Sequence, residues 1–339
     1  MMHGTAVLNI ILVLSILMQT ASGAQQPGKV YRIGYLSISP GNYETDAHNC
    51  PIGGTSYWQS TLLGLQERGY VQGRNLTLEC RYSENQSDRA QLLAAELVSL
   101  KPDLMLVNGT RQAREAMQTT RTIPIVMFGV IDPVGRELVP SLAHPGGNLT
   151  GLTDTPGEME GKRLQLLKEI IPNLARVAIL CPFAPGQETW TSKYLEPAAR
   201  SLGLSLRIYG VEGDEFAGAF DAMVKAGEEA LFVEPTPKWN TLDYPQRIAA
   251  LATLHRLPSI YQNRRFAEEG GLMSYSADSH AICRRIGFYV DKILKGANPG
   301  DLPVEQPTKF NLVINRRTAT ALGLSIPQSL MLMADEVID

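Results

Sequence analysis

The sequence predicts an α/β protein built as two similar doubly wound parallel-sheet lobes joined by a multi-strand hinge. The chain has 339 residues, which fits two domains of about 150 residues each better than one. Short apolar segments rich in β-branched residues alternate with segments of helical spacing, a pattern typical of parallel sheets covered on both faces by helices. This alternation occurs twice, on either side of a loop at 144–148, so we expect two open lobes with right-handed crossovers.

The first series of elements builds lobe 1. Its clearest helix begins near Ser87 and Asp88, which are good capping residues, and ends at Lys101-Pro102. Its clearest strand is the apolar run at 103–107. We expect strands at 30–37, 75–82, 103–107 and 123–128, and helices at 56–68, 87–100 and from 110 to about 119.

The second series builds lobe 2, and the C-terminal tail is expected to cross back and forth and complete both lobes. Lobe 1 is predicted to comprise 30–148 plus 272–305, and lobe 2 to comprise 149–271 plus 306–339. In lobe 2 and the tail we expect strands at 176–180, 204–209, 230–233, 259–261, 271–276 and 310–314, and helices at 161–171, 191–202, 215–226, 244–255, 279–295 and 316–322.

The N-terminal segment predicts a secretory signal peptide over residues 1–24. No Lys, Arg, Asp or Glu occurs before Lys29, the run at 6–18 is apolar, and 22–24 supply small residues for a cleavage site. The apolar run is too short for a permanent membrane-spanning helix, and a buried core helix is the alternative. We therefore expect a protein that is periplasmic or otherwise extracytoplasmic after cleavage and does not itself span the membrane.

Composition argues against several classes of function. Net charge is −3, with 31 basic and 34 acidic residues interspersed and no basic tract, so a nucleic-acid partner is not expected. The histidines are scattered, and no two cysteines form a CxxC pair, so no metal site is expected. In an oxidising compartment Cys50 and Cys80 could form a disulfide, and four free thiols are the alternative.

The ligand site is expected where the strands end. In parallel α/β sheets ligands lie at the carboxyl ends of the strands, and in a two-lobed protein both sets of ends face the interlobe cleft. Thr110 at a helix N-terminus could hold a carboxylate or amide, or serve as an ordinary N-cap. Asp132 and Glu234 could pair with a ligand ammonium, or stabilise turns. The candidate ligand-binding residues are Ser37, Asn108, Gly109, Thr110, Gly129, Asp132, Phe183, Glu234, Tyr261, Asn263, Ser274 and Tyr275.

Three of these candidates are aromatic residues that could form the wall of a pocket for a hydrophobic ligand. They are Phe183, Tyr261 and Tyr275, and core edges are the alternative reading for each. Catalytic signatures are absent: the sequence has no GxSxG, GxxxxGK[ST], GxGxxG after a first strand, or HExxH. We expect no catalytic residue, no cofactor and no enzymatic activity.

Several stretches in fixed order resemble the ABC-transporter substrate-binding protein family that includes tryptophan-binding lipoproteins. The stretches are RIGYLS at 32–37, LQERGYVQGRNLTLECRY at 65–82, AELVSLKPDLMLVNGT at 95–110, IPIVMFGVIDPVG at 123–135, LAHPGGNLTGLT at 142–153, GKRLQLLKEIIPNLARVAIL at 161–180, GGLMSYS at 270–276, YVDKILKGANPGDLPVEQPTKFNLVIN at 289–315 and TALGLSIPQSLMLMADEVI at 320–338. The sequence departs from the family in a longer loop at 40–55 and in the segment after Ser274.

This resemblance implies a type I periplasmic-binding fold with a three-strand hinge that closes around a ligand. It implies an extracytoplasmic solute-binding protein of an ABC importer whose closed form docks on a membrane permease with its ATPase. The ligand implied is an amino acid, aromatic or branched, or a related organic acid. A ligand-sensing receptor subunit for a signalling partner is the alternative function, and a periplasmic hydrolase is a further one.

Overall fold

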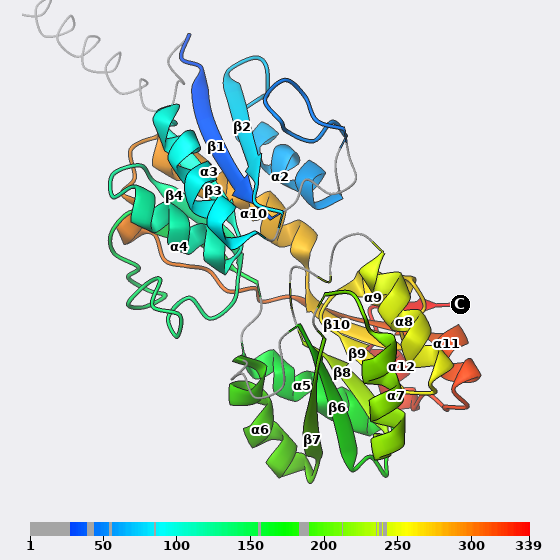
Figure 1. The fold of residues 1–339 in the computed structure, drawn as a ribbon. Helices are drawn as coiled ribbons and strands as arrows, with labels where there is room; N and C mark the ends of the chain where they lie inside the picture. The colour runs from blue at the N-terminus through cyan, green and yellow to red at the C-terminus, as the bar shows by residue number, and fades with distance from the viewer. Residues whose placement is uncertain are drawn as a thin grey trace, which may run out of the picture.

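The computed structural model has two lobes connected by several crossings of the chain (Figure 1). The structure describes residues 28–38, 44–53, 56–84, 86–154, 157–182, 190–211, 213–234, 236, 239 and 243–339. The predicted signal peptide and Phe183 lie outside these residues. Among the described helices, none is both long enough and apolar enough to cross a membrane.

Lobe 1 is a five-stranded parallel sheet with helices on both faces. Helices α2 and α10 pack on one face, where they share a core with Ile33 and Tyr35, and α3 and α4 pack on the other against Leu36 and Val107. The sheet order is β2-β1-β3-β4-β5. Its elements are β1 (Tyr31–Ser37), α2 (Ser56–Gln66), β2 (Leu76–Tyr82), α3 (Ser87–Ser99), β3 (Leu104–Asn108), α4 (Thr110–Thr119), β4 (Ile125–Val130), β5 (Leu149–Thr153) and α10 (Ser279–Leu294).

Lobe 2 is a seven-stranded sheet in the order β12-β11-β10-β9-β8-β6-β7. All neighbouring strands are parallel except β10 and β11. The C-terminal strand β12 adds an edge that the sequence did not predict. The elements are α5 (Glu158–Ile170), β6 (Arg176–Cys181), α6 (Trp190–Leu202), β7 (Ser205–Gly210), α7 (Ala217–Ala226), β8 (Ala230–Val233), α8 (Tyr244–Leu254), β9 (Ser259–Tyr261), α9 (Arg264–Glu268), β10 (Met273–Ala277), β11 (Phe310–Asn315), α11 (Arg316–Ala321), α12 (Gln328–Met333) and β12 (Glu336–Ile338).

The alternation of strands and helices therefore predicted the fold class correctly, and the lobe boundaries need correction by one strand each. Strand β5 pairs with β4 through Ile125 and Leu149, so it belongs to lobe 1 and not to lobe 2. Strand β10 pairs with β9 through Met273 and Ile260, so it belongs to lobe 2 and not to lobe 1. In both cases the chain completes one more strand of a sheet before it crosses to the other lobe, so the strand pairs with the sheet that precedes the crossing.

The chain crosses between the lobes three times, after β5, after β10 and before β11. The third crossing pairs with the first, because the Glu305 N–H donates to the Gly151 carbonyl at 3.0 Å and the Thr153 N–H donates to the Glu305 carbonyl at 2.9 Å. It also contacts the second, where the Asp278 N–H donates to the Lys309 carbonyl at 3.2 Å. These hydrogen bonds join the three crossings into a hinge.

Helices α2 and α10 are packed closely because two glycines face each other. A Cβ at Gly64 would overlap the Arg284 carbonyl, and a Cβ at Gly287 would overlap the Gly64 carbonyl. Only hydrogen fits at both positions. Helix α10, which comes late in the chain, is thereby fixed against α2 and carries the tail back into lobe 1.

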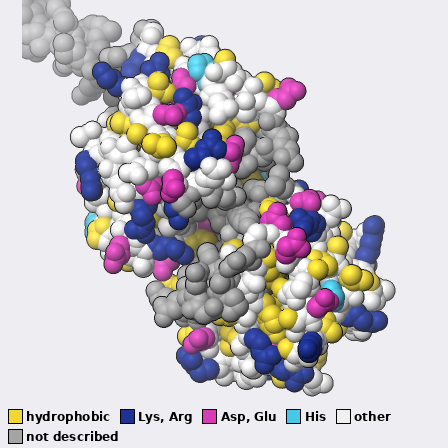
Figure 2. All heavy atoms as spheres, in the orientation of Figure 1, with side chains coloured by type: hydrophobic (Ala, Val, Ile, Leu, Met, Phe, Trp, Pro, Cys, Tyr) yellow, Lys and Arg dark blue, Asp and Glu magenta, His cyan; other side chains and the backbone are white. Residues whose placement is uncertain are grey.

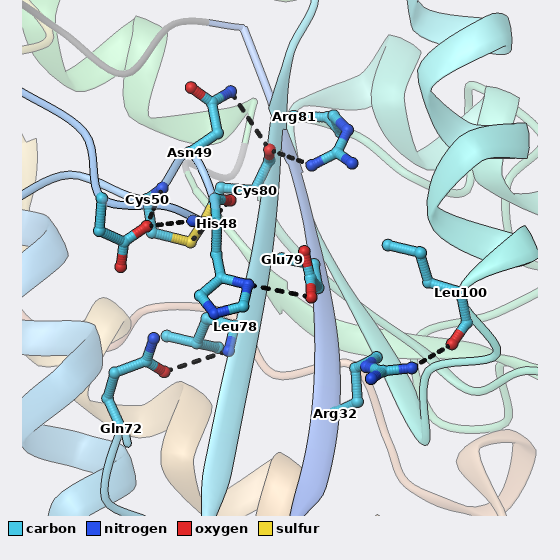
Figure 3. A network of polar contacts seen from close by, with 11 residues as sticks. Arg32, His48, Asn49, Cys50, Gln72, Leu78, Glu79, Cys80, Arg81 and Leu100 are labelled. Atoms are coloured by element: carbon cyan, nitrogen blue, oxygen red, sulfur yellow. Dashed lines mark hydrogen bonds and ion pairs between the residues drawn. A yellow bond between two sulfur atoms is a disulfide. The ribbon is translucent and has the colours of Figure 1, made fainter.

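The segment at 44–53 is attached to β2, an edge strand of the lobe 1 sheet (Figure 3). Cys50 and Cys80 form a disulfide, with their Cα atoms 5.1 Å apart, while Cys181 and Cys283 are free and buried. The Cys80 N–H donates to the His48 carbonyl at 3.0 Å, and His48 Nδ1 lies 3.1 Å from Glu79 Oε1. The pairing of Cys50 with Cys80, which the sequence left open, is thus settled.

Candidate ligand-binding site

Three strand ends of lobe 1 meet, as their parallel order requires. The phenol of Tyr35 on β1 hydrogen-bonds the side chains of Ser37 and of Asn108 at the end of β3. Gly129, near the end of β4, has φ +62°, and a Cβ there would overlap Asn108 Oδ1. Asn108 and Gly129, both half-buried, therefore form one polar surface together with the buried Ser37, and Gly129 allows the Asn108 amide to approach the β4 backbone.

Gly109 and Thr110 form the start of α4 beside this surface. Gly109 is the N-cap with φ +106°, its N–H donates to the Phe128 carbonyl at 3.0 Å, and no side chain caps the helix. Thr110 is the first helical residue, so its hydroxyl does not serve as the N-cap. Gln112 lies alongside: its Oε1 is 2.7 Å from where a Cβ of Gly109 would be, and its buried amide donates to Ser83 Oγ at 3.0 Å.

Asp132, after β4, reaches lobe 2. Its backbone has φ +48°, and its Oδ1 accepts the Gly135 N–H at 2.9 Å. Its Oδ2 accepts a hydrogen bond from the Tyr194 hydroxyl on α6 of lobe 2. The ring of Tyr194 packs against the backbone of Gly157 at the first crossing. Asp132 is thus a contact between the lobes, in addition to stabilising its own turn.

An aromatic layer supports the lobe 1 surface. The Tyr35 ring lies 5.1 Å from the Trp58 ring, 6.1 Å from Tyr82 and 6.2 Å from Phe128, to which it is nearly parallel. Burial raises the pKa of Tyr35 to about 12, so its phenol stays protonated and donates hydrogen bonds to polar partners. Together with the strand ends, this layer makes an apolar base under a polar rim.

The candidate ligand-binding residues of lobe 2 are more buried, or more engaged in contacts within their own lobe, than the sequence analysis predicted. Tyr261 is fully buried and its ring stacks on Phe266 at 4.5 Å, so the prediction that it forms a pocket wall is wrong. Ser274 is also fully buried, on β10, which has a neighbouring strand on each side. Asn263 Oδ1 accepts the Arg265 N–H at 2.9 Å and so caps α9.

Glu234 and Tyr275 are the two other described candidates of lobe 2. Glu234 follows β8 and is 2% exposed, and its N–H donates to the Leu180 carbonyl at 2.9 Å. Tyr275 is half-buried and its ring stacks on Phe310 at 5.8 Å. Tyr275 therefore belongs to the edge of the lobe 2 core. Packing within lobe 2 explains why these candidates differ from the prediction, because an aromatic or hydroxyl side chain at a strand end can contact residues of its own lobe.

A charged cluster that the sequence analysis missed lies between the lobes. Asp154 follows β5 at the first crossing and is half-buried, whereas Glu160 and Arg163, on α5, are fully buried. Arg163 Nη1 donates to Glu160 Oε1 at 2.6 Å, and Arg163 Nε donates to the Tyr275 carbonyl at 2.8 Å. Burial raises the pKa of Asp154 and of Glu160, and the charge of Arg163 opposes both shifts.

A simple signal could have found this cluster. Asp154 comes directly after the strand LTGLT, at the same edge of the sheet as Ser37, Asn108 and Asp132. The sequence analysis predicted no strand at 149–153 and placed these residues in lobe 2, so Asp154 did not count as a strand-end residue of lobe 1. Tyr194 has no comparable signal, since it lies within a helix and its position opposite Asp132 depends on how the lobes meet.

Figure 2 shows the two lobes as separate masses that meet at a narrower junction. A separate surface groove of about 470 Å³ lies between α2 and α10 on lobe 1, lined by residues that include His280, Arg285 and Phe288. No group of His, Cys, Asp and Glu side chains suited to a metal ion occurs in the described parts of the chain.

Comparison with known proteins agrees with this architecture. A tyrosine-binding protein of Clostridioides difficile is 26% identical over 261 residues, 77% of this chain and 74% of that protein. A conserved domain protein of Vibrio cholerae, 26% identical, superposes with a TM-score of 0.79 over 91% of this chain and all of that one. A Streptococcus pneumoniae protein in complex with L-Trp, 24% identical, superposes with a TM-score of 0.78 over the same shares.

The fold is that of the type I periplasmic binding proteins. Residues 57–338 match the family described as ABC transporter substrate binding protein, a range that includes both lobes and all three crossings. The chain therefore belongs to the ABC transporter substrate-binding protein family.

Proposed function

We propose that this chain is an extracytoplasmic solute-binding protein of an ABC importer, and that it captures an amino acid, aromatic or branched, or a related organic acid. One observation carries the proposal: the polar strand ends of lobe 1 face lobe 2, and Asp132 already contacts Tyr194 across the junction. A ligand held there touches both lobes, so binding favours the closed arrangement.

The chemistry of the surface supports this class of ligand. The start of α4 offers backbone N–H groups beside the Thr110 hydroxyl, which suits a carboxylate. The layer of Tyr35, Trp58, Tyr82 and Phe128 gives an apolar base of the kind that supports a ring or a branched side chain. The similar proteins named for tyrosine and in complex with L-Trp point in the same direction.

In this proposal the protein delivers its ligand without changing it. Lobe 1 binds the ligand first, rotation about the three crossings brings lobe 2 onto it, and the closed form docks on a membrane permease that works with its ATPase. The predicted signal peptide at 1–24 would place the mature protein outside the cytoplasm, and in a Gram-negative cell this compartment is the periplasm.

The test is a screen for ligands by thermal shift, followed by calorimetry. We expect an amino acid or aromatic acid to raise the melting temperature, because a ligand at 100 times its Kd stabilises the native state by about 2.7 kcal/mol. The bound compound should be recovered unchanged by mass spectrometry. Failure of every amino acid and aromatic acid to stabilise the protein would contradict the ligand class, and turnover of the compound would contradict pure binding.

Thr110→Ala is the matching variant, with Thr119→Ala as its control at the far end of the same helix. Thr119 Oγ1 donates to the Glu115 carbonyl within α4, so its removal should leave the strand ends undisturbed. We expect Thr110→Ala to weaken binding and Thr119→Ala to leave it unchanged. Equal affinities for both variants would show that the start of α4 does not hold the ligand.

A further inference from the structure

The charged cluster at the first crossing has more negative than positive charge. Asp154 and Glu160 are two carboxyl groups that interact electrostatically with each other and with one guanidinium, that of Arg163. Arg163 is committed to Glu160 and to the Tyr275 carbonyl. Among the residues that the structure describes, one carboxylate of this partly buried cluster is therefore left without a counter-charge, which is costly unless a cation or a proton joins it.

Asp154 is the part of this cluster that a ligand can reach. Its backbone N–H donates to the Val130 carbonyl at 3.0 Å, which fixes it at the end of the lobe 1 sheet. Among the described residues, its carboxylate has no hydrogen bond or ion pair. Its electrostatic neighbours are Tyr57 on α2, Cys283 on α10, and the α5 pair, so groups from both lobes surround it.

Buried atoms beside Asp154 also lack partners. Thr153 Oγ1, in the residue directly before it, and Glu160 Oε2 are both buried without a hydrogen bond. Buried polar atoms are rarely left unpaired in folded proteins, and those that are need an explanation such as an absent ligand. A carboxylate oxygen and a hydroxyl oxygen can each accept a hydrogen bond from a cation that carries several N–H donors.

We propose that Asp154, supported by Glu160 and Thr153, is the subsite for the ammonium group of the ligand. This inference rests on the proposed function and deepens it, because it requires the ligand to carry a protonated amine. Arg163 Nη2, a buried donor that also lacks a partner, remains available for the acid end of the same head group. The ammonium of a zwitterionic amino acid would then pair with Asp154 and its carboxylate with Arg163, so that one head group satisfies the unpaired atoms of the cluster.

This assignment differs from the one that the sequence favoured. Asp132 and Glu234 were the predicted ammonium partners, yet Asp132 already accepts hydrogen bonds from Gly135 and Tyr194, and Glu234 is almost fully buried. Asp154 combines partial exposure with an uncommitted carboxylate. The structure therefore favours Asp154 over both.

The test compares ligands with and without the amine, using the protein as it is exported by the cell. The probes are L-tyrosine against 3-(4-hydroxyphenyl)propionate and L-tryptophan against indole-3-propionate, measured by calorimetry. We expect the unmodified protein to bind at least one amino acid at least 100-fold more tightly than its amine-free analogue. We expect Asp154→Asn to weaken binding of that amino acid at least tenfold and to leave the affinity for the analogue unchanged, and Asp154→Glu to restore part of the loss.

Asp221→Asn is the matched control, since the Asp221 side chain on α7 is 76% exposed and this variant should bind as the unmodified protein does. Circular dichroism shows whether each variant is folded. If the amino acid binds Asp154→Asn as tightly as the unmodified protein, or if the analogue binds the unmodified protein as well as the amino acid, the subsite is wrong and the proposed solute-binding function stands. If no probe and no other amino acid binds the unmodified protein, the proposed ligand class is wrong and the subsite falls with it.

Discussion

The disulfide between Cys50 and Cys80 gives the most direct prediction of stability. The two residues are 30 positions apart, and both are buried. In the chain-entropy model, cross-linking a loop of this length removes about 12 cal/mol/K from the unfolded chain, or about 3.6 kcal/mol at 25 °C. Since the 44–53 segment is also held by the hydrogen bonds of His48 and Asn49 to Cys80, the native structure should persist without the bond.

The perturbation is the double variant Cys50→Ala/Cys80→Ala, compared with the unmodified protein in the presence and absence of dithiothreitol. Urea unfolding followed by circular dichroism should show a loss of about 2–4 kcal/mol in the variant and a similar loss on reduction of the unmodified protein. Dithiothreitol should have no effect on the variant, because Cys181 and Cys283 are free thiols. A loss below about 1 kcal/mol, or an equal effect of dithiothreitol on the variant, would refute the reasoning.

Three other predictions follow from the site. Tyr194→Phe removes the hydrogen bond to Asp132, so the ligand affinity measured by calorimetry should fall about five- to tenfold. The radius of gyration of the ligand-free protein, measured by X-ray scattering, should rise. If both values stay unchanged, this hydrogen bond does not stabilise closure. Gly129→Ala should lower the free energy of unfolding in urea by at least about 1–2 kcal/mol, because φ is +62° and a Cβ at this position would overlap Asn108 Oδ1. The control Gly218→Ala, on a helix with open space around the Cβ position, should not lower it. Equal effects of the two substitutions would contradict the argument. Burial raises the pKa of Glu160 in the folded protein above its value in the unfolded chain, so the ionised carboxylate destabilises the folded protein above the folded pKa, and this destabilisation is lost as pH falls through that pKa. The contribution of Glu160 should therefore increase the free energy of unfolding as the pH is lowered from neutral to mildly acidic. Glu160→Gln should flatten this dependence on pH, and an unchanged slope in the variant would be evidence against the argument.

Much of the fold could be predicted from the sequence because the signals are local. A strand buried on both faces must be apolar, as at 104–107, and a helix is ended by a breaker such as Pro102. The expected cap at Ser87 is wrong, because Ser87 is the first residue of α3, Gln86 is its N-cap and no side chain caps the helix. These constraints act within a few residues of each other. The alternation that they produce is enough to predict two parallel sheets with helices on both faces.

The sequence was least informative where an element could join either lobe. Strands β5 and β10 have the same apolar character as their neighbours, and only the register with β4 and β9 assigns them to a sheet. The disulfide could not be decided from the sequence for the same reason, since pairing Cys50 with Cys80 depends on the 44–53 segment lying along the edge of β2.

For the site, the sequence determined which residues end strands, and only the tertiary structure decided which of them come together and which are buried within one lobe. Ser37, Asn108 and Gly129 meet because parallel strands present their carboxyl ends at one edge. Tyr261 and Ser274 share that position in lobe 2, but they are fully buried within its core. Asp154 and Tyr194 gain their importance from contacts across the hinge, and such contacts depend on how two separately folded lobes approach each other, which no local pattern encodes.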